Sequence, residues 1–270
     1  MKIRFALALT ALLPLMVACK AQDGTADTTA PAAPAATEAA PAAATPAPAA
    51  DAAAPAAAAT ATDAPVATPV PAQARLVGPE PVAGTDYVVI EGGQPFQPAT
   101  GKVEVAEIFG YVCPACARFQ PLIAPWKAGL PSDVSFVYVP AAFGGIWDNY
   151  ARAFYAAETL GVQEKTHDAL YTAIHIEQTL KGERGMDTPE DIANFYAKYG
   201  VQPKTFTDTM ASFSVAAKVN RGKQFAQRSK IGGTPSVIIN GKYLVKGKSF
   251  EDMLRIADHL IARERAANAK

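Results

Sequence analysis

The sequence predicts an α/β fold for residues 81–270 of the 270-residue chain. Three observations lead to this fold class: a strand–helix–strand pattern over residues 102–139, a run of helical segments after it, and an Asn-Gly hairpin signal followed by a last helix. No aromatic residue occurs between Phe5 and Tyr87, and all others lie from Tyr87 onward. A packed hydrophobic core is therefore expected only in this C-terminal part.

The strand–helix–strand pattern comes first. Residues 102–109 (KVEVAEIF) are rich in β-branched and apolar side chains and follow Gly101, which indicates a strand. A helix is expected over residues 113–127, because apolar residues recur there three and four positions apart, and Pro121 should kink it. Residues 134–139 (VSFVYV) predict a second strand. Two strands joined by one helix form a βαβ unit, so these strands should run parallel.

A block of helices is predicted at about residues 146–228, with one helix start marked by a capping Thr188 and Pro189 after it. The chain then returns to two short strands joined by Asn-Gly, the strongest short hairpin signal, and residues 250–263 predict a closing amphipathic helix. Without the helical block, this order of elements is that of the thioredoxin fold. The prediction is therefore a thioredoxin-like fold with an inserted α-helical subdomain.

The N-terminus has the pattern of an export signal. Lys2 and Arg4 precede an apolar run that is too short to span a bilayer. A small residue directly before Cys19 is similar to the cleavage box of bacterial lipoproteins, although Met16 departs from the usual leucine. Residues 1–18 are therefore predicted to be a lipoprotein-type signal peptide and Cys19 the lipidated residue. An ordinary secretory signal with a chance cysteine is the alternative.

Residues 19–80 are predicted to be a disordered linker. Between positions 21 and 75 there are 27 Ala and 9 Pro, and the prolines interrupt every candidate helical turn. No apolar periodicity gives this segment a face to bury. It would hold the domain away from a membrane, whereas a passive low-complexity insert predicts the same conformation. The linker has no aromatic residue and no apolar stripe for a dimerisation domain, so a monomer is expected.

Cys113 and Cys116 carry the chemistry that the sequence indicates. They remain once Cys19 is assigned to the lipid, and their C-x-x-C spacing falls where a strand ends and a helix begins. Unpaired amides and the dipole at a helix start favour an anion, so Cys113 is expected to be an exposed, acidic nucleophile. Cys116 is expected to be shielded and to resolve the mixed disulfide. Pro114 suits the first helical position.

Other roles for the cysteine pair fit less well. Zinc needs two further ligands, and the three histidines of the chain offer no ligand pair at close spacing. An inert structural disulfide across two residues would close too short a loop to stabilise the fold. A chance C-x-x-C in a cytosolic protein contradicts the export signal. The pattern therefore predicts a redox-active Cys113–Cys116 disulfide, with no metal and no further cofactor.

Three motifs together resemble the DsbA family of thiol–disulfide interchange proteins: residues 107–116 (EIFGYVCPAC), 233–237 (GTPSV) and 240–243 (NGKY). The resemblance covers roughly residues 85–265 and implies thiol:disulfide oxidoreductase activity. It also implies that Pro235 is a cis-proline beside the disulfide and that the backbone before it, at Thr234, pairs with substrate. An ordinary trans proline at a strand start is the alternative.

Glu107 is the other residue that the resemblance singles out. In the family, an acid at this position is buried and modulates proton transfer at the cysteines. The alternative is a carboxylate that reaches solvent at the strand end, because a buried charge without a partner is costly. In some members a buried lysine accompanies this acid. Val137 lies at the corresponding position here, so that pairing is not expected.

Two departures from the family concern oxidising strength. Family oxidases often carry a histidine between the cysteines, whose positive charge supports the thiolate, and Ala115 cannot do this. Thr234 replaces the valine that precedes the cis-proline in the best-known oxidase. Both departures predict a somewhat weaker oxidant in which the helix start still makes Cys113 acidic.

The sequence thus predicts a periplasmic thiol:disulfide oxidoreductase that Cys19 anchors to a membrane. The first hypothesis is an oxidase that acts on reduced or misoxidised exported proteins and is recycled by a membrane redox partner. The second is a reductase or isomerase kept reduced by a membrane electron donor, and the third a non-catalytic lipoprotein that binds partners and retains the fold. With 25 basic and 25 acidic residues, the net charge indicates no nucleic-acid partner.

Overall fold

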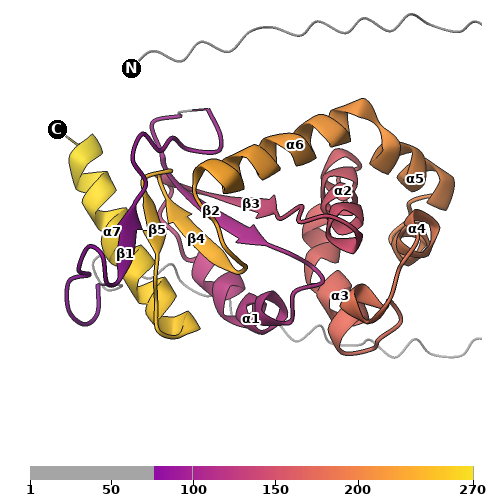
Figure 1. Ribbon diagram of the computed structural model, residues 1–270, viewed down its shortest axis with the longest axis horizontal. Coiled ribbons are helices and arrows are strands. Elements are labelled where there is room, and N and C mark those ends of the chain that lie inside the picture. The colour runs from indigo at the N-terminus through magenta and orange to yellow at the C-terminus, as the bar shows by residue number, and fades with distance from the viewer. Residues whose placement is uncertain (1–75, 99, 270) are drawn as a thin grey trace, which may run out of the picture. The chain divides into compact units, whose positions relative to one another are not determined.

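The structure is a computed structural model that describes residues 76–98 and 100–269. The predicted signal peptide, Cys19 and the predicted linker up to residue 75 lie outside the described residues. Within them, the chain forms an α/β domain on a mixed sheet with the strand order β1-β5-β4-β2-β3 (Figure 1). The predicted α/β class is confirmed.

The predicted βαβ unit forms the centre of this sheet. β2 (Val103–Phe109) pairs in parallel with β3 (Val134–Pro140), and α1 (Pro114–Ala128) connects the two strands. Every residue of β2 is buried, because this strand has neighbours on both sides and helices over both faces. The helical assignment of α1 continues past Pro121 and Pro125. β2 therefore leads directly from the middle of the sheet into the helix that carries the cysteines.

The C-terminal elements complete the other half of the sheet. β4 (Ser236–Ile239) pairs antiparallel with β2 and with β5 (Tyr243–Val245). Asn240 and Gly241 between β4 and β5 have φ values of 52° and 69°, the left-handed backbone that an Asn-Gly hairpin turn uses. α7 (Phe250–Asn268) follows and runs past the predicted end at residue 263. The hairpin prediction is confirmed.

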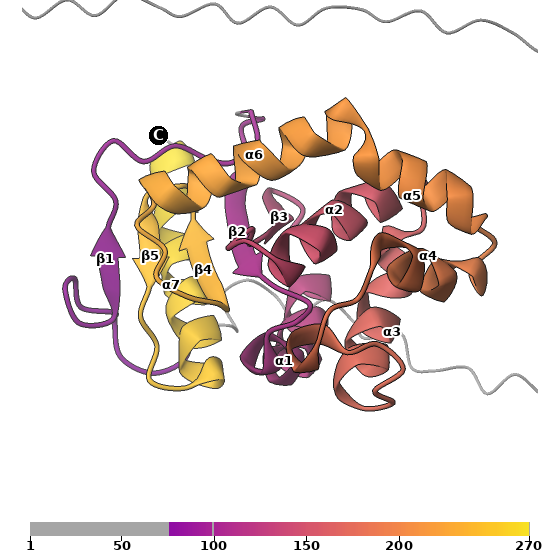
Figure 2. The same cartoon turned by 45° about the vertical axis from the view of Figure 1, so that its right-hand side comes forward.

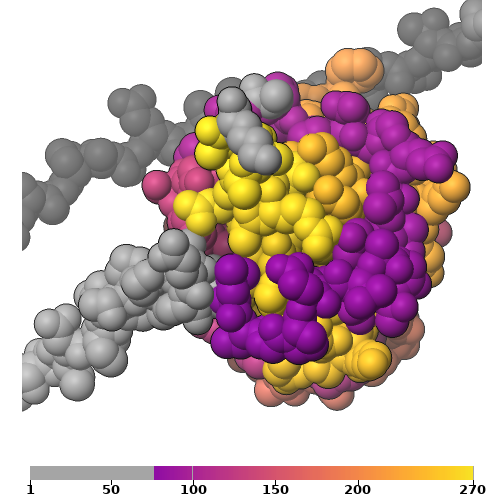
Figure 3. All heavy atoms as spheres, turned by 90° about the vertical axis from the view of Figure 1, so that its left-hand side faces the viewer, coloured from indigo at the N-terminus to yellow at the C-terminus, as the bar shows by residue number. Residues whose placement is uncertain are grey.

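One edge strand was not predicted from the sequence. β1 (Tyr87–Val89) pairs antiparallel with β5, and a three-residue strand is too short to show an alternating pattern. Tyr87 is buried and packs edge-on against Tyr243, with 5.4 Å between ring centroids. The segment before β1 lies over α7 (Figure 3), where Arg255 donates to the carbonyl of Pro79 at 2.6 Å. This strap fixes the start of the folded domain.

The helical insertion extends from the β3 side of the sheet, away from β1 (Figures 1 and 2). Its last helix, α6 (Phe213–Arg228), packs over the sheet face opposite α1 and α7, where Phe225 belongs to one hydrophobic cluster with Ile108 and Ile238. Thr188 caps α4 (Pro189–Ala197) in a reciprocal capping box with Asp191, as predicted for this helix start. The elements are α2 (Ile146–Thr159), α3 (Gln163–His175), the 3₁₀ turn η2 (Gly182–Arg184), α4 (Pro189–Ala197), α5 (Pro203–Ala211) and α6 (Phe213–Arg228).

The helical insertion packs closely against the end of β2 at one glycine, Gly110. Trp147 of α2 lies against Gly110, the first residue after β2, and a Cβ atom at this position would overlap the indole ring. The backbone of Gly110 is not in the left-handed region, so the need for glycine here is steric. The contact therefore sets how closely α2 approaches the turn that leads to the cysteines.

We expect Gly110→Ala to lower the free energy of unfolding by roughly 1–3 kcal/mol, because the added methyl group must displace a packed indole ring. Gly232→Ala is the matched control, since a Cβ atom at Gly232 meets nothing within 4 Å. Its effect should stay within about 0.5 kcal/mol. Urea denaturation of both variants, compared at an unchanged m-value, measures the difference. Equal midpoints for the two variants would contradict the steric argument.

Candidate active site

Cys113 occupies the N-cap position of α1. β2 ends at Phe109, a short turn follows, and Cys113 has an extended backbone (φ −76°, ψ 116°) before Pro114 begins the helix. The backbone amide of Cys116 donates to the Sγ atom of Cys113 at 3.3 Å. The sulfur therefore takes the place of a side-chain oxygen in an N-cap, where a helix start offers unpaired N–H groups.

Cys113 and Cys116 are free thiols. Cys116 is shielded, as predicted, and Cys113 is more enclosed than the sequence suggested. Cys113 has 7% of its surface exposed and Cys116 has 1%. Cys113 is more exposed than Cys116, as predicted, but the prediction that Cys113 is an exposed residue is wrong. The physical reason is that the loop before β4 covers the sulfur, with 3.5 Å between Sγ of Cys113 and the carbonyl oxygen of Thr234.

That loop contains the peptide bond between Thr234 and Pro235, which is cis as the family resemblance implied. In its protonated form the Cys113 thiol donates to the carbonyl of Thr234, so the backbone before the cis-proline lies in contact with the sulfur. β4 begins directly after it, at Ser236. The structure thus brings Thr234 and Pro235 to the cysteines from a segment about 120 residues away in the sequence.

The two sulfurs have opposite acidities. The pKa of Cys113 is lowered to about 5, first by a hydrogen bond from the Cys116 thiol and further by the Thr234 side chain and by the amides of Cys116 and Ala115, against the opposing effect of burial. Burial, followed by the hydrogen bond to Cys113, raises the pKa of Cys116 far above that of an ordinary thiol. At neutral pH, the pair therefore holds one thiolate, on Cys113, and one proton, on Cys116.

Glu107 lies on β2 and is 1% exposed, so the alternative in which its carboxylate reaches solvent is excluded. Burial raises its pKa to about 8, the positive charge of Lys127 lowers it, and the charge of Cys113 raises it. Val137 carries no charge, as the sequence analysis noted, but a cation comes instead from the last turn of α1. Sequence reasoning missed Lys127, because a lysine near a helix C-terminus is ordinary at a solvated surface.

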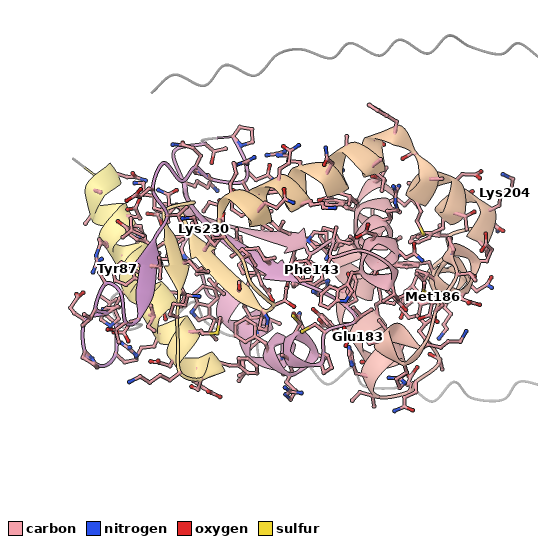
Figure 4. All side chains as sticks on the ribbon, in the orientation of Figure 1. Tyr87, Phe143, Glu183, Met186, Lys204 and Lys230 are labelled. Carbon is pink, nitrogen blue, oxygen red and sulfur yellow. The ribbon has the colours of Figure 1, made fainter. Side chains whose placement is uncertain are left out.

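The remaining surroundings are mostly apolar and aromatic. Phe143, labelled in Figure 4, lies between β3 and α2, is 50% exposed, and packs on Trp147 with 5.0 Å between ring centroids. On the other side of the cysteines, His175 of α3 bonds through Nε2 to the carbonyl of Tyr111 at 2.7 Å. No cluster of three or more His, Cys, Asp or Glu suited to a metal ion occurs in residues 76–98 and 100–269.

Comparison with known proteins decides the family. A profile of the DSBA-like thioredoxin domain matches residues 104–257, more than half of the chain. The chain belongs to this family. The matched region begins on β2 and ends within α7, so it contains both cysteines, the cis-proline loop and the whole helical insertion.

Relatives in the DsbA family resemble this chain over most of their length. The chain is 40% identical over 192 residues to the thiol:disulfide interchange protein DsbA of Pseudomonas aeruginosa, covering 70% of this chain and 88% of that protein. The protein of the same name from Azotobacter vinelandii is 38% identical over 200 residues, covering 72% and 90%. The crystal structure of the oxidoreductase DsbA from Xylella fastidiosa matches with a TM-score of 0.67 at 46% identity, covering 69% and 98%.

These matches confirm the thioredoxin-like fold and show that the chain is a thiol:disulfide oxidoreductase. Among the described residues, no helix is both long enough and apolar enough to cross a membrane.

We expect the reactivity of Cys113 toward iodoacetamide to follow a pKa of about 5 in the reduced protein. In Cys116→Ala this pKa should rise by roughly one to two units, because the thiol that donates the strongest hydrogen bond is lost while the backbone amides remain. Peptide-level mass spectrometry reports Cys113 separately from Cys19. An unchanged pKa in Cys116→Ala would show that the helix start alone makes Cys113 acidic.

Proposed function

We propose that this DsbA-family protein is an oxidase that introduces disulfides into exported proteins through the Cys113–Cys116 pair, without a further cofactor. The observation that carries this proposal is the division of roles at the start of α1. Cys113 is the more accessible sulfur with a pKa of about 5, and Cys116 is buried with a raised pKa. A good leaving thiolate in front of a protonated resolving thiol favours the reduced pair, which makes the disulfide oxidising.

The reaction transfers two electrons in two exchanges. A substrate thiolate attacks Sγ of Cys113, the bond between Cys113 and Cys116 breaks, and Cys116 leaves with the electron pair and takes up a proton. A second substrate thiolate then attacks the substrate sulfur of the mixed disulfide. The substrate disulfide forms, and Cys113 leaves as a thiolate that needs no proton because of its low pKa. The substrate is oxidised and the cysteine pair is reduced.

Glu107 is placed to supply and remove the proton of Cys116. Its charge and that of Cys116 act on each other, since Glu107 raises the pKa of Cys116. When Cys113 is in a mixed disulfide, its negative charge is gone, and the part of the Glu107 pKa shift that this charge caused disappears. The pKa of Glu107 is then lower, so more of it is ionised, and its carboxylate can accept the proton that Cys116 must lose to close the disulfide. In substrate oxidation the transfer runs the other way, and Glu107 donates a proton to Cys116.

The strength of the oxidant should be intermediate. The nucleophilic thiol has a pKa near 7 in thioredoxin and near 3.5 in the strongly oxidising DsbA, and the value of about 5 for Cys113 lies between them. Ala115 supplies no charge between the cysteines, which supports this ranking. Thr234 and Pro235 form the substrate-pairing loop in the proposal, and Pro114 and Ala115 are the residues that complete the redox motif. Half-exposed Phe143 offers an apolar contact for unfolded substrates.

We place the protein in the periplasm as a monomer, anchored to a membrane through a lipid on Cys19 and linked to the domain by residues 19–80. Its partners in this proposal are reduced or misoxidised exported proteins and a membrane redox protein that restores the disulfide, and no nucleic acid. The export pattern of residues 1–18 supports this location. An exported chain reaches an oxidising compartment, where disulfides form and persist.

We expect Cys113 and Cys116 to be mostly disulfide-bonded in growing cells, as trapped by acid quench and an alkylating mass tag. The variant Cys113→Ser/Cys116→Ser gives the reference band. A mostly reduced pair would favour a reductase or isomerase kept reduced by a membrane donor.

Cys113→Ser should lower insulin reduction at least about 100-fold, since the nucleophile is lost. Unchanged insulin reduction and unchanged folding of exported proteins would leave a non-catalytic binding lipoprotein.

We expect Cys19→Ser to move the protein from the detergent phase to the aqueous phase of a Triton X-114 partition, because the lipid attachment site is lost. Its insulin reduction should stay within about twofold of the parent, since Cys19 lies outside the redox motif. Mass spectrometry of the parent N-terminus should show a diacyl-glyceryl group on Cys19. A parent that partitions into the aqueous phase would instead support an ordinary secretory signal.

A further inference from the structure

Several buried polar atoms near Glu107 make no hydrogen bond of ordinary length to another described residue. The side chains are Gln120 (7% exposed), Tyr138 (9%) and His167 (3%), together with Glu107 itself, and the atoms are Oε1, Oη, Nε2 and Oε2 respectively. A buried polar group without a partner costs about 1–3 kcal/mol, so such groups in folded proteins are normally met by water. Four of them around one place indicate a hydrated site.

A cavity of about 550 Å³ lies next to these atoms, between β3, α1, α2 and α3. Gln120, Tyr138 and His167 all line it, as does Lys127. A water molecule occupies about 30 Å³ in the liquid, so the cavity has room for many. Three nine-tenths-buried side chains that carry a partnerless polar atom thus line the same space.

Tyr138 lies between this cavity and Glu107. Glu107 on β2 and Tyr138 on β3 are register partners in the parallel pair, so their side chains lie side by side on the same face of the sheet. Burial and then the charge of Glu107 raise the pKa of Tyr138, against a smaller lowering by a weak hydrogen bond from the Gln120 side chain, so the hydroxyl keeps its proton. A neutral hydroxyl both donates and accepts, which lets it pass a proton without itself becoming charged.

His167 lines the cavity and carries an N–H donor there. Tyr111 Oη lies 2.8 Å and the amide of Gln163 lies 3.2 Å from Nδ1 of His167, and both groups carry protons to donate. The pKa of His167 is lowered to about 3, by burial and by the charge of Lys127, so the ring is neutral at pH 7. Its single proton is therefore on Nε2, the atom without a partner. Nε2–H can orient water but does not take up a proton.

Lys127 supplies the positive charge of this site. Its Nζ lies 4.7 Å from the ring centroid of Tyr138. Its charge lowers the pKa values of both Glu107 and His167. Glu107 interacts electrostatically with groups from three elements. These are Cys113, Cys116 and Lys127 of the α1 segment, Tyr138 of β3 and Tyr171 of α3.

We propose that this cavity is the proton outlet of the active site, and that the Tyr138 hydroxyl and water held by Gln120 and His167 connect Glu107 to solvent. The inference rests on the proposed function, because it concerns the proton that Cys116 gains and loses. Cys116–SH gives its proton to the Glu107 carboxylate as its sulfur attacks Sγ of Cys113 in the mixed disulfide. The bond between Cys113 and the partner sulfur breaks, and the partner leaves as a thiolate with the electron pair. The carboxylic acid then passes that proton through Tyr138 to water in the cavity. In substrate oxidation the same path runs inward.

The test uses the full chain with Tyr138→Phe, which keeps the ring and removes the hydroxyl. Reduced protein is mixed with oxidised glutathione, quenched in acid and resolved by mass. Attack by Cys113 should keep its rate within about twofold, because Cys113 is already a thiolate. Closure by Cys116 should slow roughly tenfold and show a larger solvent isotope effect, since its proton has lost the outlet. The equilibrium constant with glutathione should stay within about twofold, because a path does not change its end states.

Tyr196→Phe is the matched control, since Tyr196 is also buried and its hydroxyl also makes no hydrogen bond of ordinary length, but it does not line the cavity. It should change neither step. In Lys127→Met, the pH at which closure is half-maximal should rise by roughly half a unit, because the charge that lowers the Glu107 pKa is gone.

Two results would overturn the outlet. The first is closure in Tyr138→Phe at the parental rate and isotope effect. The second is an equal slowing of closure in Tyr138→Phe and Tyr196→Phe, which would make the effect one of packing. Failure of the parent protein to exchange with glutathione at all is a separate outcome, since it would reject the proposed function and the outlet with it.

Discussion

The active site depends on the position of Cys113 at the start of α1, where its sulfur meets the Cys116 thiol, the largest cause of its low pKa, and the Cys116 amide at 3.3 Å. A helix start leaves N–H groups without partners, and a thiolate at the N-cap position satisfies one of them. For this to happen, β2 must end at Phe109, the turn must be tight, and Pro114 must begin the helix. The chemistry therefore follows from where a strand stops and a helix starts.

The helical insertion determines the other half of the chemistry. α3 brings Tyr171 and His167 against the face of the sheet that carries Glu107, where they pack with Phe109 and Tyr138 in one aromatic cluster. This burial is the main cause of the raised pKa values of Glu107 and Cys116. The start of α1 makes one sulfur acidic, and the insertion keeps its neighbour protonated. The asymmetry of the pair is thus produced by two separate parts of the fold.

Much of this could be predicted from sequence because it is local. Hydrophobic periodicity predicted the βαβ unit, and Asn240-Gly241 predicted the hairpin. The C-x-x-C motif at a strand end predicted that the thiol of Cys113 is acidic. The cis bond at Pro235 and the burial of Glu107 came only with the family resemblance. β1 was missed because three residues show no pattern. Lys127 and the cavity were missed because they arise from contacts between elements far apart in the chain, and no local pattern records those.

Ionisation of Cys113 also determines how oxidising strength varies with pH. In the unfolded chain its pKa is about 9.0 and in the fold about 5, so the thiolate stabilises the reduced fold in full above pH 9, and this contribution is lost as the pH falls through 5. The disulfide form has no such thiolate. Glu107, with a pKa raised to about 8 mainly by burial, acts in the opposite direction, and the part of this shift that burial causes is common to both redox forms. Between pH 5 and 9, rising pH therefore favours the reduced fold, and the disulfide becomes the stronger oxidant relative to an ordinary dithiol.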